Sequence, residues 1–234
     1  MGIEISGIKV RRQPTDTSCG ATCLHALYRF YGRRANLEDL IQEVPESPEG
    51  GTQSVFLACH ALQLGFSAVT YSYNLRIFDP TWSELTSVEL LSRLEAREQI
   101  LDNDKLRASH QAYIKFLKMG GSIRMDDLSP ALLEHLLGQG GPVIAGLTST
   151  YLYNESRMTE GSRPDDVKGS AEGHFVIVVG YEAATQRVIL ADPYHPNRLS
   201  EKEQYSVSVF RFINSVMLGV LTYDANLLII KPRK

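Results

Sequence analysis

A run of almost uniformly apolar side chains, from Ala21 to Tyr31, constrains the fold of this 234-residue chain more than any other feature. The run has the length of a helix, and apolar side chains would cover nearly every side of that helix. Gly32 follows it, as glycine often follows the last helical turn. A helix without a polar face has to be enclosed by other elements, so the sequence predicts a central helix that is buried on most sides.

The segment QPTDTSCG at 13–20 leads directly into this helix. Cys19 therefore falls in the first helical turn, where the positive end of the helix dipole favours a thiolate. Thr17 or Ser18 is expected to cap the helix with its hydroxyl. Gln13 stands six residues before the cysteine. Its carboxamide and the backbone N–H of Cys19 are the kind of donors that stabilise the oxyanion of an acyl transfer.

Two apolar stretches in the last third of the chain predict a β-hairpin, with strands at about 175–181 and 187–191. His174 begins the first of these strands, and Asp192 directly follows the second. The open end of a hairpin brings the first residue of one strand close to the last residue of the other. We therefore expect the side chains of His174 and Asp192 to lie side by side.

Cys19, His174 and Asp192 supply a nucleophile, a base and an orienting carboxylate, which are the three groups of a thiol enzyme. Taken singly, each signal is weak, because a lone cysteine or histidine is more often structural than catalytic. Their order in the chain, the strand placement and the glutamine spacing agree, and together they favour the catalytic interpretation. His195 is a competing base, but it lies in a loop after the strand, so we prefer His174.

Four further residues are predicted to contact a substrate. Gly20 leaves room beside the sulfur, and Asp16 is close to the nucleophile in sequence. Tyr151 and Tyr153 stand where the chain leaves a predicted strand. The polar, glycine-containing stretch that follows, at about 154–173, lacks periodicity and leads into His174, so we expect a mobile loop on the rim of the active site.

At these residues the sequence resembles the C39-like cysteine peptidases, papain-fold enzymes best known as leader-peptide-cleaving domains of bacteriocin exporters. The similar segments are QPTDTSCGATCLHALYRFYG at 13–32, GTQSVFLACHALQLGFSA at 51–68, LSPALLEHLLGQGGPVIAGL at 128–147 and GHFVIVVGYEAATQRVILADPY at 173–194. The resemblance implies that Cys19 is the nucleophile, His174 the base, Asp192 its orienting partner and Gln13 part of the oxyanion hole. No transporter domain follows, so coupling to export is not implied.

The expected fold class is α+β, a papain-like fold in which the central N-terminal helix packs on an antiparallel sheet. We expect one domain, 1–234, with a helical insertion at about 74–127. Local patterns and cap residues predict the remaining elements. The predicted helices are 36–44, 54–64, 82–118, 129–137 and 206–218, and the predicted strands are 66–73, 142–147 and 226–230.

Composition excludes several classes of function. The 24 basic and 27 acidic residues give a net charge of −3 without a basic cluster, which argues against nucleic acid as a partner. The sequence contains no run of about 18 apolar residues, so we expect no membrane association and a cytoplasmic location. The three cysteines have no framework spacing, and Cys19 and Cys23 lack nearby ligands. We therefore expect neither disulfides, nor a metal, nor another cofactor.

The leading functional hypothesis is a cysteine peptidase or amidase that acts on a peptide or protein through a thioester. An acyl- or peptidyl-transferase would use the same acyl-enzyme and differ only in its acceptor. A non-catalytic peptide-binding module on the same fold is the third hypothesis; such relatives usually lack the cysteine or the histidine, and both are present here.

Overall fold

The computed structural model describes residues 2–47 and 50–233. Within these residues the chain forms eight α-helices, eight strands and two short 3-10 helices at Pro80–Trp82 and Gly219–Thr222. The helices are α1 Cys19–Phe30, α2 Leu37–Glu43, α3 Ser54–Gln63, α4 Ser87–Glu98, α5 Asp104–Lys118, α6 Pro130–Gly138, α7 Ser149–Tyr153 and α8 Val209–Leu218. The strands are β1 Gly2–Glu4, β2 Phe66–Ser72, β3 Ser122–Arg124, β4 Val143–Thr148, β5 Gly173–Glu182, β6 Arg187–Ala191, β7 Gln204–Ser208 and β8 Asn226–Pro232.

Local signals explain where several helices begin and end. Gly32 adopts a φ of 76° just after α1, a left-handed conformation that glycine takes without a steric penalty. The Asn36 side chain accepts a hydrogen bond from the N–H of Glu38 at the start of α2. Ser129 caps α6 in the same manner, with Pro130 in the first turn. These helices were therefore predictable from neighbouring residues alone.

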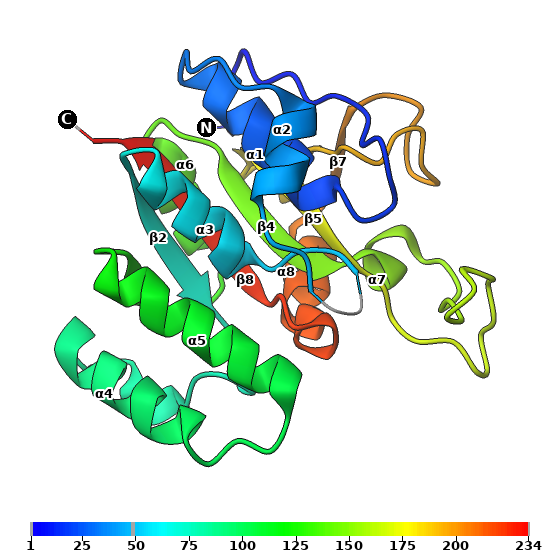
Figure 1. Ribbon diagram of the computed structural model, residues 1–234. Helices are drawn as coiled ribbons and strands as arrows, with labels where there is room; N and C mark the ends of the chain where they lie inside the picture. Colours follow the sequence, from blue (N-terminus) through cyan, green and yellow to red (C-terminus); the bar gives the residue numbers. More distant parts are fainter. Residues whose placement is uncertain (1, 48–49, 234) are drawn as a thin grey trace.

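One sheet joins all the strands, in the order β3-β2-β8-β4-β5-β6-β7, and β1 pairs with β5 beside that path. The pairing is antiparallel except between β2 and β3, which run parallel. In Figure 1, α1 and α3 cross the near face of the sheet, whereas α6 and α8 lie behind it. The expected α+β arrangement, with the N-terminal helix packed on a mostly antiparallel sheet, is confirmed.

The alternation of side chains along the strands divides the apolar interior between the two faces. In β5, Phe175, Ile177 and Val179 belong to the cluster that contains α1. Val176 and Val178 belong to the other cluster, which contains side chains of α6 and α8. Because β5 is apolar on both faces, it is covered by helices from both sides, and its first residues lie where α1 begins.

The predicted helical insertion consists of two antiparallel helices, α4 and α5, rather than one continuous helix (Figure 1). Thr86 and Glu89 form a reciprocal capping box at the start of α4, and Asn103 caps α5. Leu94 of α4 and Phe116 of α5 are fully buried in the cluster that also contains α1. Both helices thus take part in the packing around the central helix.

The prediction of a helix over 206–218 was wrong at its start. Residues Gln204–Ser208 form β7, and α8 begins only at Val209. The strand is stabilised by its pairing with β6, in which Val207 lies opposite Val188. Among the described residues, no helix combines the length and the apolar character needed to cross a membrane.

Candidate active site

Cys19 is the first residue of α1, and its side chain is almost completely buried. The predicted hydroxyl cap is not formed, although Ser18 does occupy the N-cap position. The Ser18 hydroxyl instead accepts from the N–H of Thr15 at 3.0 Å and donates to the carbonyl of Thr15 at 2.9 Å. These two hydrogen bonds stabilise the turn from Thr15 to Ser18 before the helix. The position of the Cys19 thiol is therefore fixed by this turn as well as by α1.

The β5–β6 hairpin brings His174 and Asp192 side by side, as its predicted geometry required. The imidazole Nε2 lies 2.8 Å from Oδ1 of Asp192. Both side chains are buried, with 6% of His174 and none of Asp192 exposed. Because Nε2 is taken by the carboxylate, Nδ1 is the ring nitrogen left to interact with the Cys19 thiol.

The environment of His174 favours the imidazolium. Burial acts to lower its pKa, but the charge of Asp192 and the hydrogen bond to it act in the opposite direction. A side-chain hydrogen bond with Cys19 adds to this effect, and the resulting pKa of His174 is about 10. At neutral pH the ring therefore holds a positive charge beside the sulfur, which is the arrangement that generates a reactive thiolate.

Asp192 is held by more groups than His174 alone. The hydroxyls of Tyr153 and Tyr205 donate to its Oδ2 at 2.7 and 2.5 Å. The backbone N–H of Tyr194 donates to Oδ1 at 2.9 Å. Burial acts to raise the pKa of Asp192, yet His174 and the two phenols outweigh it and lower this pKa. Asp192 is therefore an anion at neutral pH.

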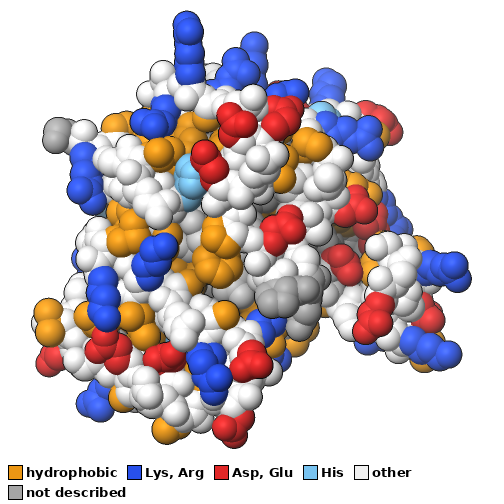
Figure 2. Space-filling view, in the orientation of Figure 1, with side chains coloured by type: hydrophobic (Ala, Val, Ile, Leu, Met, Phe, Trp, Pro, Cys, Tyr) orange, Lys and Arg blue, Asp and Glu red, His pale blue; other side chains and the backbone are white. Residues whose placement is uncertain are grey.

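A cavity of about 450 Å³ opens in front of Cys19 and His174. Acidic side chains border the shaded hollow near the centre of Figure 2. Asp16, which was predicted to contact substrate, does line this cavity. Burial and the nearby charge of Asp16 raise the pKa of Glu172, another residue of the wall. The stretch 170–173 also belongs to the wall, so the end of the predicted rim loop reaches the site.

The other residues predicted to contact substrate lie outside this cavity. Tyr153 is buried, with 2% exposed, behind Asp192. Tyr151 is 38% exposed and stacks under the guanidinium of Arg211. A Cβ on Gly20 would lie 2.5 Å from the Thr52 side chain, so this glycine lets α1 pack closely against its neighbours. Its structural role is therefore in packing.

Gln13 lies beside the carboxyl end of β6, because its backbone N–H donates to the carbonyl of Pro193 at 2.9 Å. Its side-chain Nε2 donates to the carbonyl of Thr15 at 2.9 Å. Its Oε1 is buried and has no hydrogen-bond partner among the described residues. The structure thus places the backbone of Gln13 next to Pro193, which directly follows Asp192 in the chain. The side-chain amide of Gln13 is bonded within its own loop.

Sequence reasoning missed several residues of the cavity wall, among them Lys105, Tyr223 and Asp224. Lys105, from α5 of the insertion, places its ammonium 4.0 Å from the ring centre of Tyr223. Asp224 is buried beside them, accepts from the N–H of Ser54 at 3.0 Å, and has its pKa raised to about 7 by burial. These contacts join segments far apart in the chain, so no local sequence pattern predicts them.

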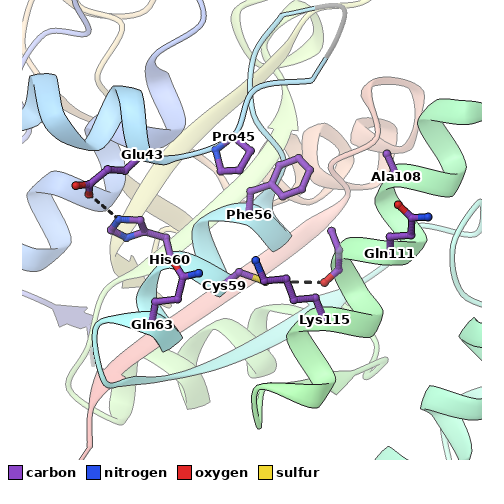
Figure 3. Close-up of a pocket in the computed structure, with 10 residues that line it drawn as sticks. Glu43, Pro45, Phe56, Cys59, His60, Gln63, Ala108, Gln111 and Lys115 are labelled. Carbon is purple, nitrogen blue, oxygen red and sulfur yellow. Dashed lines mark hydrogen bonds and ion pairs between the residues drawn. The ribbon is translucent and has the colours of Figure 1, made fainter.

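A second cavity of about 440 Å³ contains another neighbouring cysteine and histidine, Cys59 and His60 (Figure 3). Their side chains point in different directions: His60 is held between Glu43 and Tyr28, whereas the Cys59 thiol faces the carbonyl of Ala112. Burial raises the pKa of Cys59 to about 11. This pair therefore cannot form a thiolate–imidazolium couple. Within the described parts of the chain, no three His, Cys, Asp or Glu side chains gather as a metal ion requires.

Comparison with protein families gives two matches. Residues 7–91 match the model of the Peptidase C39 family, and residues 105–215 match that of the Peptidase C39 like family. The first match contains Cys19, and the second contains His174 and Asp192. No curated protein matches the chain significantly.

Solved structures of similar shape carry related descriptions. A Bacillus anthracis protein described as a C39-like peptidase has a TM-score of 0.50 and 13% identity, covering 100% of this chain and 98% of its own. The peptidase domain of ComA, a bifunctional ABC transporter of Streptococcus, has a TM-score of 0.48 and 14% identity, covering 97% and 100%. Xylellain, a cysteine protease of Xylella fastidiosa, has 0.46 and 14%, covering 100% and 86%. At these identities the likeness to the Bacillus anthracis protein concerns the fold alone.

Proposed function

The chain belongs to the C39-like cysteine peptidases, and we propose that it hydrolyses a peptide bond with Cys19 as nucleophile, His174 as acid and base, and Asp192 as the orienting carboxylate. One observation carries this assignment. His174 lines the same cavity as the Cys19 thiol, its imidazole pKa is raised to about 10, and the buried Asp192 carboxylate holds its ring from behind. A peptide or protein segment in this cavity would meet the Cys19 thiol and the His174 imidazole.

The first half of the reaction forms a thioester. The Cys19 thiolate attacks the carbonyl carbon, and the negative charge moves to the carbonyl oxygen. The backbone N–H groups at the start of α1 have no intrahelical acceptors and are suited to receive that oxygen. The His174 imidazolium then donates its proton to the leaving amine, and the first peptide fragment departs.

The second half releases the acyl group. Neutral His174 takes a proton from water, which attacks the thioester carbonyl and regenerates the thiolate with the imidazolium. Asp192 stays ionised throughout and keeps the ring in the tautomer that has a proton on Nε2. The test is mass spectrometry of the protein with candidate peptides encoded beside its gene. Two fragments that together gain one water support hydrolysis, whereas transfer to an added amine would indicate a transferase.

The three cysteines are expected to differ in reactivity toward iodoacetamide. Cys19 should be alkylated in the folded protein at neutral pH, because it lines the cavity beside an imidazolium. Burial raises the pKa of the Cys23 thiol well above its usual value and that of Cys59 to about 11, so both should react only after unfolding. Peptide mapping after labelling measures this. Equal labelling of all three cysteines would contradict the proposed ion pair.

Replacement of Gln13 by alanine is expected to lower kcat by about 10²–10³ while KM changes little, if its carboxamide turns to the oxyanion during the reaction. Steady-state kinetics on a cleaved peptide provide the measurement. Gln99→Ala, which removes an exposed amide at the end of α4, is the matched control and should leave both constants unchanged. A raised KM with an unchanged kcat would show that Gln13 binds substrate and does not stabilise the transition state.

A further inference from the structure

The two oxygens of the Asp192 carboxylate have different partners. Oδ1 receives the imidazole of His174 and the backbone N–H of Tyr194. Oδ2 receives the hydroxyls of Tyr153 and Tyr205, at 2.7 and 2.5 Å, and lies 3.4 Å from the side-chain amide of Asn197. Oδ1 thus contacts the imidazole of His174, whereas Oδ2 accepts hydrogen bonds from the two tyrosine hydroxyls on the side away from that ring.

These hydrogen bonds are important because Asp192 has no exposed surface. A buried carboxylate is strongly disfavoured unless donors replace the water that it loses. Burial and the charge of Asp192 raise the pKa of both Tyr153 and Tyr205, so both phenols keep their protons and always act as donors. Neither can accept the proton that His174 holds.

The two phenols come from elements that are themselves anchored. Tyr153 is the last residue of α7, and the guanidinium of Arg211 in α8 donates to the carbonyls of Leu152 and Tyr151 at 2.8 Å each. Tyr205 lies in β7, where it pairs with Leu190 of β6. The hydroxyls therefore approach Asp192 from a helix and from a strand that flank it, and neither hydroxyl touches the cavity in front of Cys19.

We propose that Tyr153 and Tyr205 are positioning residues of the catalytic site, which hold the Asp192 carboxylate in place so that it orients the imidazole of His174. The proposal rests on the function proposed above. The titratable groups facing the carboxylate are His174, the two phenols and, through space, Cys23, while Cys19 lies beyond the imidazole. The phenols are thus the two hydroxyl donors that stabilise the buried anion on the side away from the cavity.

The proposal has a measurable consequence for pH dependence. Each phenol points the positive end of its O–H dipole at the carboxylate. Removing one makes the site more negative, so protons are held there up to a higher pH. The pH at which Cys19 loses reactivity on acidification should therefore rise in a Tyr→Phe variant. Packing alone predicts no such shift, because phenylalanine fills nearly the same volume.

The experiment compares Tyr153→Phe, Tyr205→Phe and the double variant with the unaltered protein. The rate of Cys19 alkylation by iodoacetamide is followed from pH 3 to 9 by mass spectrometry, and kcat and KM are measured on a cleaved peptide. We expect each single variant to raise the acidic midpoint by about half a pH unit or more, and kcat to fall about tenfold with little change in KM. The double variant should shift the midpoint further than either single one.

Tyr73→Phe is the matched control, since the Tyr73 hydroxyl is buried without a hydrogen-bond partner among the described residues. It should leave the midpoint in place. Tyr205 is only partly buried, so Tyr205→Phe alone decides the matter if Tyr153→Phe does not fold. Unmoved midpoints, even with lowered melting temperatures, would overturn the positioning role. If Cys19 of the unaltered protein is alkylated like a free thiol, the proposed triad fails, and the positioning role fails with it.

Discussion

Replacement of Cys19 by alanine is expected to abolish peptide hydrolysis, with a loss in kcat of about 10⁴ or more. The alanine methyl group cannot attack a carbonyl, and neither of the other two cysteines can replace the thiol: Cys23 is fully buried, and Cys59 lies in the other cavity with its pKa raised to about 11 by burial. The fold should persist, because Cys19 lies at the edge of a cavity and no hydrogen bond of α1 depends on its sulfur. Product formation measured by mass spectrometry, with circular dichroism of the variant, provides the test.

Cys59→Ala is the matched control for this change. It removes a thiol of the same size from the second cavity and should leave hydrolysis intact. The Cys19→Ala protein should still bind its peptide, because the cavity walls are unchanged, and this binding can be measured by calorimetry. If Cys19→Ala keeps the full biological activity of the protein, the catalytic proposal fails and a peptide-binding module takes its place.

Replacement of His174 by alanine is expected to be nearly as severe, with kcat lowered by about 10³–10⁴. The change removes both the cation beside Cys19 and the proton donor for the leaving amine. It also leaves the buried Asp192 anion without its counter-ion, so we expect the free energy of unfolding to fall by about 3 kcal/mol. Steady-state kinetics and urea unfolding measure the two effects separately.

His195→Ala is the control that the chain itself offers, because His195 lies just after Asp192 in the chain but lines a different surface hollow from His174. This variant should retain activity. The opposite pattern, in which His195→Ala is inactive and His174→Ala is active, would show that the base has been misassigned. If the His174→Ala protein loses activity without any loss of stability, the buried ion pair contributes less than its geometry indicates.

The sequence was sufficient for the elements that carry local signals. The apolar run after Cys19, the caps at Asn36 and Ser129 and the glycine at position 32 each depend on neighbouring residues only. The hairpin that places His174 beside Asp192 was predictable for the same reason, since both of its strands and its turn lie within one short segment. The two apolar stretches therefore predicted the strands whose ends carry His174 and Asp192.

The remaining features depend on contacts between distant segments. The short strands β1 and β3 have too few residues to show an alternating pattern, and they form because a neighbouring strand supplies the hydrogen bonds. The two phenols behind Asp192 were beyond prediction in the same way. The sequence singles out Tyr153 only as a substrate contact and Tyr205 not at all, and their place behind Asp192 is set by the way α7 and β7 meet at the end of β6.

The distance along the chain between the parts of the site has a consequence for biosynthesis. The Cys23 thiol of α1 reaches the carbonyl of Phe175 across 152 positions, and Cys19 and His174 are joined over a similar span. Contacts of such long range form slowly, because the entropy lost in closing a long loop opposes them. On the ribosome, Cys19, the proposed nucleophile, is synthesised long before His174 and has no imidazole beside it until the β5–β6 hairpin has emerged and docked. If the proposed triad is correct, the chain gains its thiol reactivity only after most of its length has been synthesised.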